Sequence, residues 1–123
     1  MNKYAARGIL VDAMGGTRFL IVERDHHAVH AAVRIFAEEA TALTLPVRVR
    51  RANGDERVDM PGRGTIRFTT PRSNRHRGLL VDVVFVDNDA HRVLDGDDPT
   101  PMRRFFEDVA PVLNATGGEF VHS

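Results

Sequence analysis

Two aspartates, Asp87 and Asp89, follow a short apolar run and are the residues of this sequence best placed to do chemistry. The run, Leu79–Val86, is rich in valine, interrupted only by Asp82 and bounded by charged residues, which is typical of a buried parallel strand. In open α/β sheets, ligands bind beyond the carboxyl ends of strands, where Asp87 would lie. Because carboxylate oxygens bind Mg²⁺, the pair is a candidate metal site. A solvated acidic loop continuing to Asp98 is the favoured alternative.

A second group of candidate residues is basic and lies just before the apolar run. Five side chains are candidates for binding nucleic acid or another anion: Arg67, Arg72, Arg75, His76 and Arg77. Arginine favours this role because its guanidinium presents a planar fork to a phosphate. No Tyr or Phe lies between Arg72 and Arg77, so this loop does not indicate base stacking. The alternative is a solvated loop that pairs with the acidic residues Asp95–Asp98.

Composition limits the classes of protein to consider. At 123 residues the chain is predicted to form a single domain, residues 1–123, with a real hydrophobic core. The formal net charge is zero, so only local patches can attract nucleic acid. There is no cysteine, which excludes disulfides and thiolate chemistry. No stretch approaches a membrane span or a signal peptide, and we expect a cytoplasmic protein with no membrane partner.

Two helices and a strand are predicted in the first third of the chain. Apolar residues at helical spacing predict a helix over Asn2–Met14, with a strand at Gly8–Val11 as the alternative. A compact apolar strand is expected within Thr17–Glu23. Asp25 then caps an amphipathic helix over His26–Leu43. The histidines near its start have no third ligand at metal-binding spacing, so we interpret them as solvated.

The middle of the chain alternates apolar and charged residues at the period of a half-exposed strand. Three such segments are Val47–Arg51, Glu56–Met60 and Thr65–Thr69, joined by the turns Asn53-Gly54 and Pro61–Gly64. Together they predict an antiparallel meander. Further on, Thr100-Pro101 opens a helix, and Glu119–His122 is a last short strand. The predicted fold class is α/β, with a short, mostly parallel sheet, flanking helices and the meander as an insertion.

This order of elements resembles the ATPase core of phage terminase large subunits and related helicases. The residues that carry the resemblance are, in order, Asn53-Gly54, Ile66-Arg67-Phe68, Arg72–Arg77, Gly78 and Val83–Asp87. In that family they correspond to a hairpin turn, an Ile-Arg-Phe strand, an Arg-rich loop, an Arg-Gly step and the Walker B strand. The resemblance implies a phage-encoded protein. It also makes Asn2–Met14 the helix after the phosphate loop and Glu119–Ser123 the coupling strand.

Two departures from the family pattern change what the resemblance implies. The sequence contains no Gly-x-x-x-x-Gly-Lys-Ser/Thr, the loop and lysine that hold the β and γ phosphates. The position of the catalytic Glu is occupied by Asn88, which cannot accept a proton as a base. We therefore expect a non-catalytic interaction module without a cofactor, which binds a protein partner and, through the Arg-rich loop, nucleic acid. The alternative is a Mg²⁺-dependent phosphotransfer enzyme or nuclease centred on Asp87 and Asp89.

The resemblance also predicts an open edge on the sheet. The family's strand before the phosphate loop would pair beside the coupling strand, so Glu119–His122 would lie at an exposed edge. Three covers are considered: the chain's own Gly8–Val11 as a strand, a strand donated by a partner protein, or a second copy. Of these we favour a homodimer.

Overall fold

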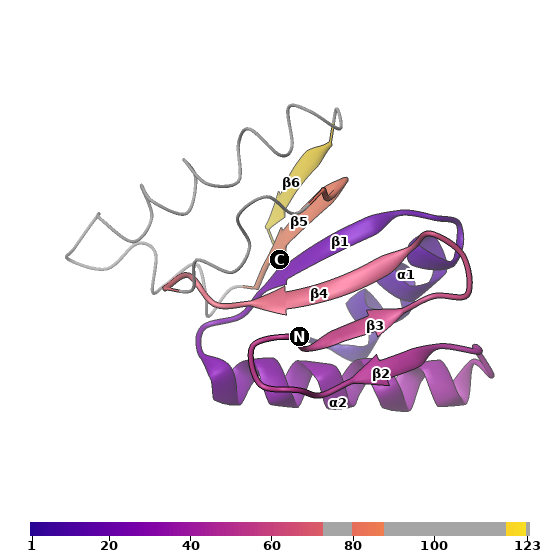
Figure 1. The fold of residues 1–123 in the computed structure, drawn as a ribbon, viewed down its shortest axis with the longest axis horizontal. Helices are drawn as coiled ribbons and strands as arrows, with labels where there is room; N and C mark the ends of the chain where they lie inside the picture. The colour runs from indigo at the N-terminus through magenta and orange to yellow at the C-terminus, as the bar shows by residue number, and fades with distance from the viewer. Residues whose placement is uncertain (73–79, 88–117, 123) are drawn as a thin grey trace.

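The computed structural model describes residues 1–72, 80–87 and 118–122, and Figure 1 shows their arrangement. Helix α1, Lys3–Met14, precedes the first strand, and helix α2, His26–Ala42, follows it. The strands of the described residues are β1 (Arg18–Val22), β2 (Arg48–Arg50), β3 (Arg57–Asp59), β4 (Thr65–Thr69), β5 (Val83–Val86) and β6 (Glu119–His122). They form one sheet in the order β2-β3-β4-β1-β5-β6.

The sheet is mixed, and β4 is where its two parts meet. β2, β3 and β4 pair antiparallel, whereas β4, β1, β5 and β6 pair parallel. The predicted α/β fold with a mostly parallel sheet and an antiparallel meander is therefore confirmed. The sequence pattern placed Thr65–Thr69 only in the meander. Its second role as the parallel neighbour of β1 was missed, because alternation does not reveal which strands pair.

Both helices begin at a side-chain cap, and the one at Asp25 was predicted. The Asn2 side-chain oxygen accepts a hydrogen bond from the Ala5 N–H at 2.9 Å, which satisfies an otherwise unpaired amide at the start of α1. Asp25 does the same for the Ala28 N–H at 2.8 Å at the start of α2, and this bond lowers the pKa of the Asp25 carboxyl. The alternative strand at Gly8–Val11 is wrong, because those residues lie inside α1.

The main core lies between the sheet and the two helices, which cover the same face (Figure 1). Phe36 of α2 is fully buried and meets Phe68 of β4 edge to face, with ring centroids 5.4 Å apart. Edge-to-face aromatic pairs add stabilisation beyond the burial of their surface. β1 contributes Phe19 and Ile21 to this core, while Leu20 and Val22, which alternate to the opposite face, are buried as well. A strand buried on both faces explains its uninterrupted apolar sequence.

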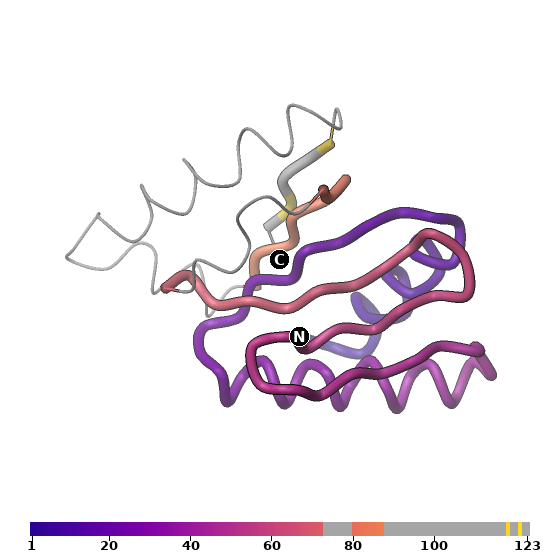
Figure 2. Tube along the Cα trace, in the orientation of Figure 1, coloured from indigo at the N-terminus to yellow at the C-terminus, as the bar shows by residue number. Residues whose placement is uncertain are grey.

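The apolar run that precedes Asp87 forms a shorter strand than its sequence indicates. β5 begins only at Val83, and Leu80 is exposed. β5 lies between β1 and β6, so β1 and β5 are the two inner strands of the parallel part of the sheet. Figure 2 traces this path, with β5 beside β1. The apolar run starts at Leu79 in the sequence, and its acidic residue Asp82, just before β5, pairs with Arg18 of β1.

The last predicted strand is confirmed as β6, which pairs with β5 and ends the strand order. Among the strands that the structure describes it lies at the edge of the sheet, as expected for Glu119–His122. The helix expected from Thr100-Pro101 lies outside the described residues. Within the described residues, neither helix combines the length and apolar composition needed to span a membrane.

Candidate functional site at the carboxyl ends of the parallel strands

Three parallel strands end side by side and bring polar residues together. Val22 at the end of β1 is in register with Thr69 of β4 and Val86 of β5. Main-chain hydrogen bonds extend this alignment, since the Glu23 N–H donates to the Thr69 oxygen at 2.9 Å and the Asp87 N–H donates to the Val22 oxygen at 3.1 Å. Glu23 and Asp87 are therefore neighbours at the edge where α/β sheets bind ligands.

Both carboxylates at this edge are buried: Glu23 is 2% exposed and Asp87 is 8% exposed. Removing two carboxylates from water is costly unless cations or hydrogen bonds compensate. For Asp87 a cation is present, because its carboxylate oxygen lies 2.6 Å from the amino group of Met1. This amino group stands just before α1, so the start of α1 closes over the end of β5. The arrangement holds the Asp87 carboxylate in an ion pair.

Glu23 is a candidate site residue that the sequence reasoning missed. It follows the apolar strand β1 just as Asp87 follows β5. The rule that singled out Asp87, a carboxylate directly after a buried strand, would also have identified Glu23. The sequence prediction placed the strand within Thr17–Glu23, and the structure makes Glu23 the first residue beyond it.

A small pocket lies next to this edge, between the start of α2 and the end of β4. It is lined by His26, Val29, Gly54, Glu56, Phe68, Thr69 and Thr70. His30, one turn after His26, has its Nε2 3.9 Å from the buried Glu56 carboxylate. In the part of the chain that the structure describes, no group of three or more His, Cys, Asp or Glu side chains could hold a metal ion. The histidines are exposed.

At the other end of β1, Arg18 and Asp82 form a specific pair. The Arg18 Nε and Nη2 donate to the two Asp82 carboxylate oxygens at 3.2 and 3.1 Å, and the Arg18 main-chain N–H donates to the same carboxylate at 2.9 Å. These hydrogen bonds lower the pKa of the Asp82 carboxyl, and the bonds from the Arg18 side chain have the largest effect. The pair explains why an acidic residue interrupts the apolar run. It fixes the register between β1 and β5 at their amino ends.

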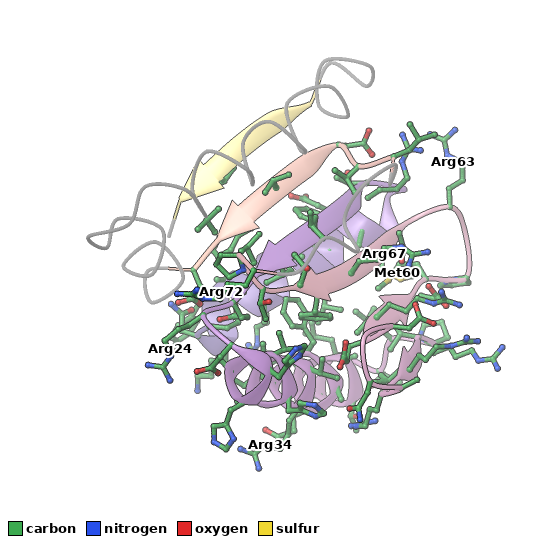
Figure 3. All side chains as sticks on the ribbon, turned by 60° about the vertical axis from the view of Figure 1, so that its left-hand side comes forward. Arg24, Arg34, Met60, Arg63, Arg67 and Arg72 are labelled. Carbon is green, nitrogen blue, oxygen red and sulfur yellow. The ribbon has the colours of Figure 1, made fainter. Side chains whose placement is uncertain are left out.

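The predicted anion-binding residues are only partly described. Arg67 lies on β4, half-buried, with its Nη1 3.6 Å from the Asp55 carboxylate. Arg72 is exposed beyond the end of β4. Figure 3 shows Arg67 and Arg72 well apart, so the structure does not bring the two together. Arg75, His76 and Arg77 lie outside the described residues, as do Asn88 and the predicted metal ligand Asp89.

Comparison with known proteins finds a similarity in structure but no match in sequence. No family model matches the sequence, and no curated protein matches it either. Among solved structures, the fold is similar to that of the large terminase from a thermophilic bacteriophage, with a TM-score of 0.62 and 12% sequence identity. The similarity covers 95% of this chain and 29% of that terminase chain, so this chain spans less than a third of its length. The terminase-like fold predicted from the order of short motifs is confirmed.

Proposed function

We propose that this chain is a non-catalytic interaction module built on a P-loop ATPase-like fold of phage origin. In this role it binds a protein partner and, through the arginine-rich loop Arg72–Arg77, nucleic acid. The fold likeness to a phage terminase supports the origin and the ATPase-like architecture. The proposal separates architecture from activity, since one fold hosts many functions and the site decides among them.

The residue after Asp87 is the observation that carries the non-catalytic proposal, because Asn88 stands where the terminase family has its catalytic Glu. A magnesium ligand needs space for the metal, its waters and a phosphate oxygen on the same side of the carboxylate. Here an ammonium group lies 2.6 Å from that carboxylate. The amide of Asn88 cannot act as a base toward water. Neither feature favours phosphotransfer at this position.

The edge strand β6 is where we place the protein partner. β6 pairs with β5 on one side and is the last strand in the order. The outer main-chain groups of an edge strand are a template for a strand from another chain. A second copy of this chain is the partner we favour, and a strand donated by a different protein is the alternative.

One observation favours the rival function, a metal-dependent phosphotransfer enzyme or nuclease. Glu23 and Asp87 are two buried carboxylates at adjacent strand ends, an arrangement that a divalent cation would stabilise. In that function the metal would displace the Met1 amino group from Asp87. The second predicted ligand, Asp89, lies outside the described residues.

Titration calorimetry with Mg²⁺ and with Mn²⁺ separates the two functions. We expect no saturable heat for either metal up to about 1 mM, because the Asp87 carboxylate is already paired. Asp87→Asn is the control variant, since it removes one charge and keeps the side-chain shape. Saturable binding to the unmodified protein that disappears in Asp87→Asn would contradict the proposal and favour the enzyme.

A further inference from the structure

Three arginines form a row across the antiparallel meander. Arg50 of β2 is in register with Arg57 of β3, and Arg57 is in register with Arg67 of β4. They point away from the helices, because the intervening residues Val58 and Ile66 are buried in the helix-facing core. Like charges placed directly opposite one another across strands are destabilising. The row therefore needs an anion to offset its charge.

Asp55 supplies that anion within the chain. Its carboxylate lies 3.5 Å from Nη1 of Arg50, 3.3 Å from Nη1 of Arg57 and 3.6 Å from Nη1 of Arg67. A single carboxylate thus forms ion pairs with three guanidinium groups. Arg57 also donates through Nε to Asp59 at 3.1 Å. Even with both aspartates counted, the three arginines leave one positive charge in excess.

The face that carries the row is polar throughout the meander. Asp59 of β3 lies opposite the exposed Arg48 of β2 and the half-exposed Thr65 of β4. Adding Arg48 gives four arginines against two aspartates, Asp55 and Asp59. The arginines of the row are accessible, with side-chain exposures of 40% for Arg50, 21% for Arg57 and 32% for Arg67.

We propose that the row of Arg50, Arg57 and Arg67 is a binding surface for the phosphate backbone of nucleic acid. Adjacent strands are about 4.8 Å apart, so the row spans about 10 Å and can meet successive phosphates. Each guanidinium is a planar donor that matches a phosphate oxygen pair. Asp55 occupies the position that a phosphate takes on binding, and it restrains affinity by competing for the same donors.

Nucleic acid fits this face better than an acidic protein does. Protein interfaces depend on buried aromatic or aliphatic anchors, whereas the described residues of this face on β2, β3 and β4 alternate Arg, Asp and Thr. Backbone binding to DNA needs cations alone and carries no sequence preference. The surface is therefore expected to bind without base specificity. The row rests on the nucleic-acid part of the proposed function, and its binding does not depend on whether Asp87 holds a metal.

The test measures binding of a fluorescein-labelled 20-base-pair duplex by anisotropy, using the full chain at about 50 mM salt. If the row contacts three phosphates, a plot of the logarithm of the binding constant against the logarithm of the salt concentration should have a slope of about −2.7. The combined variant Arg50→Gln, Arg57→Gln and Arg67→Gln should lose about tenfold or more in affinity. Its salt slope should become shallower, by about one for each arginine removed.

A matched control removes the same charge from the helical side of the molecule. Arg7, Arg24 and Arg34 are exposed there, and two of them also have carboxylate partners, Glu39 and Asp25. Changing all three to Gln alters the net charge equally and should weaken duplex binding less than twofold. Equal weakening in the two combined variants would overturn the proposal, because it would show a response to net charge alone.

Asp55→Asn gives a change in the opposite direction and does not rely on the combined variant folding. It removes the competing carboxylate from the three guanidinium groups and keeps the side-chain shape. Duplex affinity should rise several-fold, and thermal stability should fall slightly as the ion pairs are lost. Unchanged or weaker duplex binding by Asp55→Asn would overturn the proposal. So would polyglutamate competing with the duplex at equal charge concentration, which would assign the surface to an acidic protein.

Discussion

Replacing Gly64 with alanine is expected to destabilise the protein by about 3 kcal/mol or more, or to prevent folding. Gly64 ends the turn between β3 and β4, and it passes against the carboxyl end of α1. A Cβ atom at this position would lie 1.8 Å from the Ala13 main-chain oxygen and 2.7 Å from the Ala13 carbonyl carbon. Both atoms belong to the main chain of a helix, so no side-chain rotation can relieve the clash.

Thermal unfolding measures this effect against a control in the same turn. A Cβ atom added at Gly62 would have no heavy atom of another part of the chain within 4 Å, so Gly62→Ala should melt close to the unmodified protein. Gly64→Ala should lower the melting temperature by about 10 °C or more. If both variants melt together, α1 does not pack against this turn as described.

The second large effect is expected at Phe36. Its side chain is fully buried between α2 and the sheet and meets Phe68 edge to face at 5.4 Å. Phe36→Ala removes an aromatic ring and leaves a cavity that backbone elements on two sides cannot close. The free energy of unfolding should fall by about 3–5 kcal/mol, measured by urea denaturation.

Tyr4→Ala is the matched control for Phe36→Ala. Tyr4 is 72% exposed, and its ring contacts the Lys3 ammonium at 5.3 Å from the ring centroid. An exposed cation–π contact contributes about 0.5–1 kcal/mol, so the loss should stay below about 1 kcal/mol. A smaller cost for Phe36→Ala than for Tyr4→Ala would mean that the core between the helices and the sheet is placed wrongly.

The elements were predictable from sequence because each depends on neighbours along the chain. Asn2 and Asp25 cap helices through amides three residues away. The short, continuous apolar runs of β1 and β5 predict buried strands. The order of short motifs, read together, was enough to indicate the terminase-like fold, which the likeness to the solved terminase structure confirms.

The contacts that complete the fold join distant residues and leave no local pattern. Arg18 meets Asp82 across 64 positions, and the sequence alone identified Asp82 only as an interruption. Gly64 is needed because α1 approaches its turn, which no property of the turn sequence reveals. The arginine row of the meander also leaves no local pattern, because strand pairing is what aligns its three residues around Asp55. Sequence reasoning proposed Arg67 as an anion-binding residue and Arg50 as a possible extension of that surface, but not their alignment with Arg57.

The proposed non-catalytic role is tested most directly by titrating the purified protein with fluorescent ATP in the presence of Mg²⁺. The 123 residues contain no phosphate-binding loop motif, and the Asp87 carboxylate is held by the Met1 amino group. We expect no saturable fluorescence change up to about 1 mM nucleotide. Micromolar affinity, weakened by Asp87→Asn, would contradict this role.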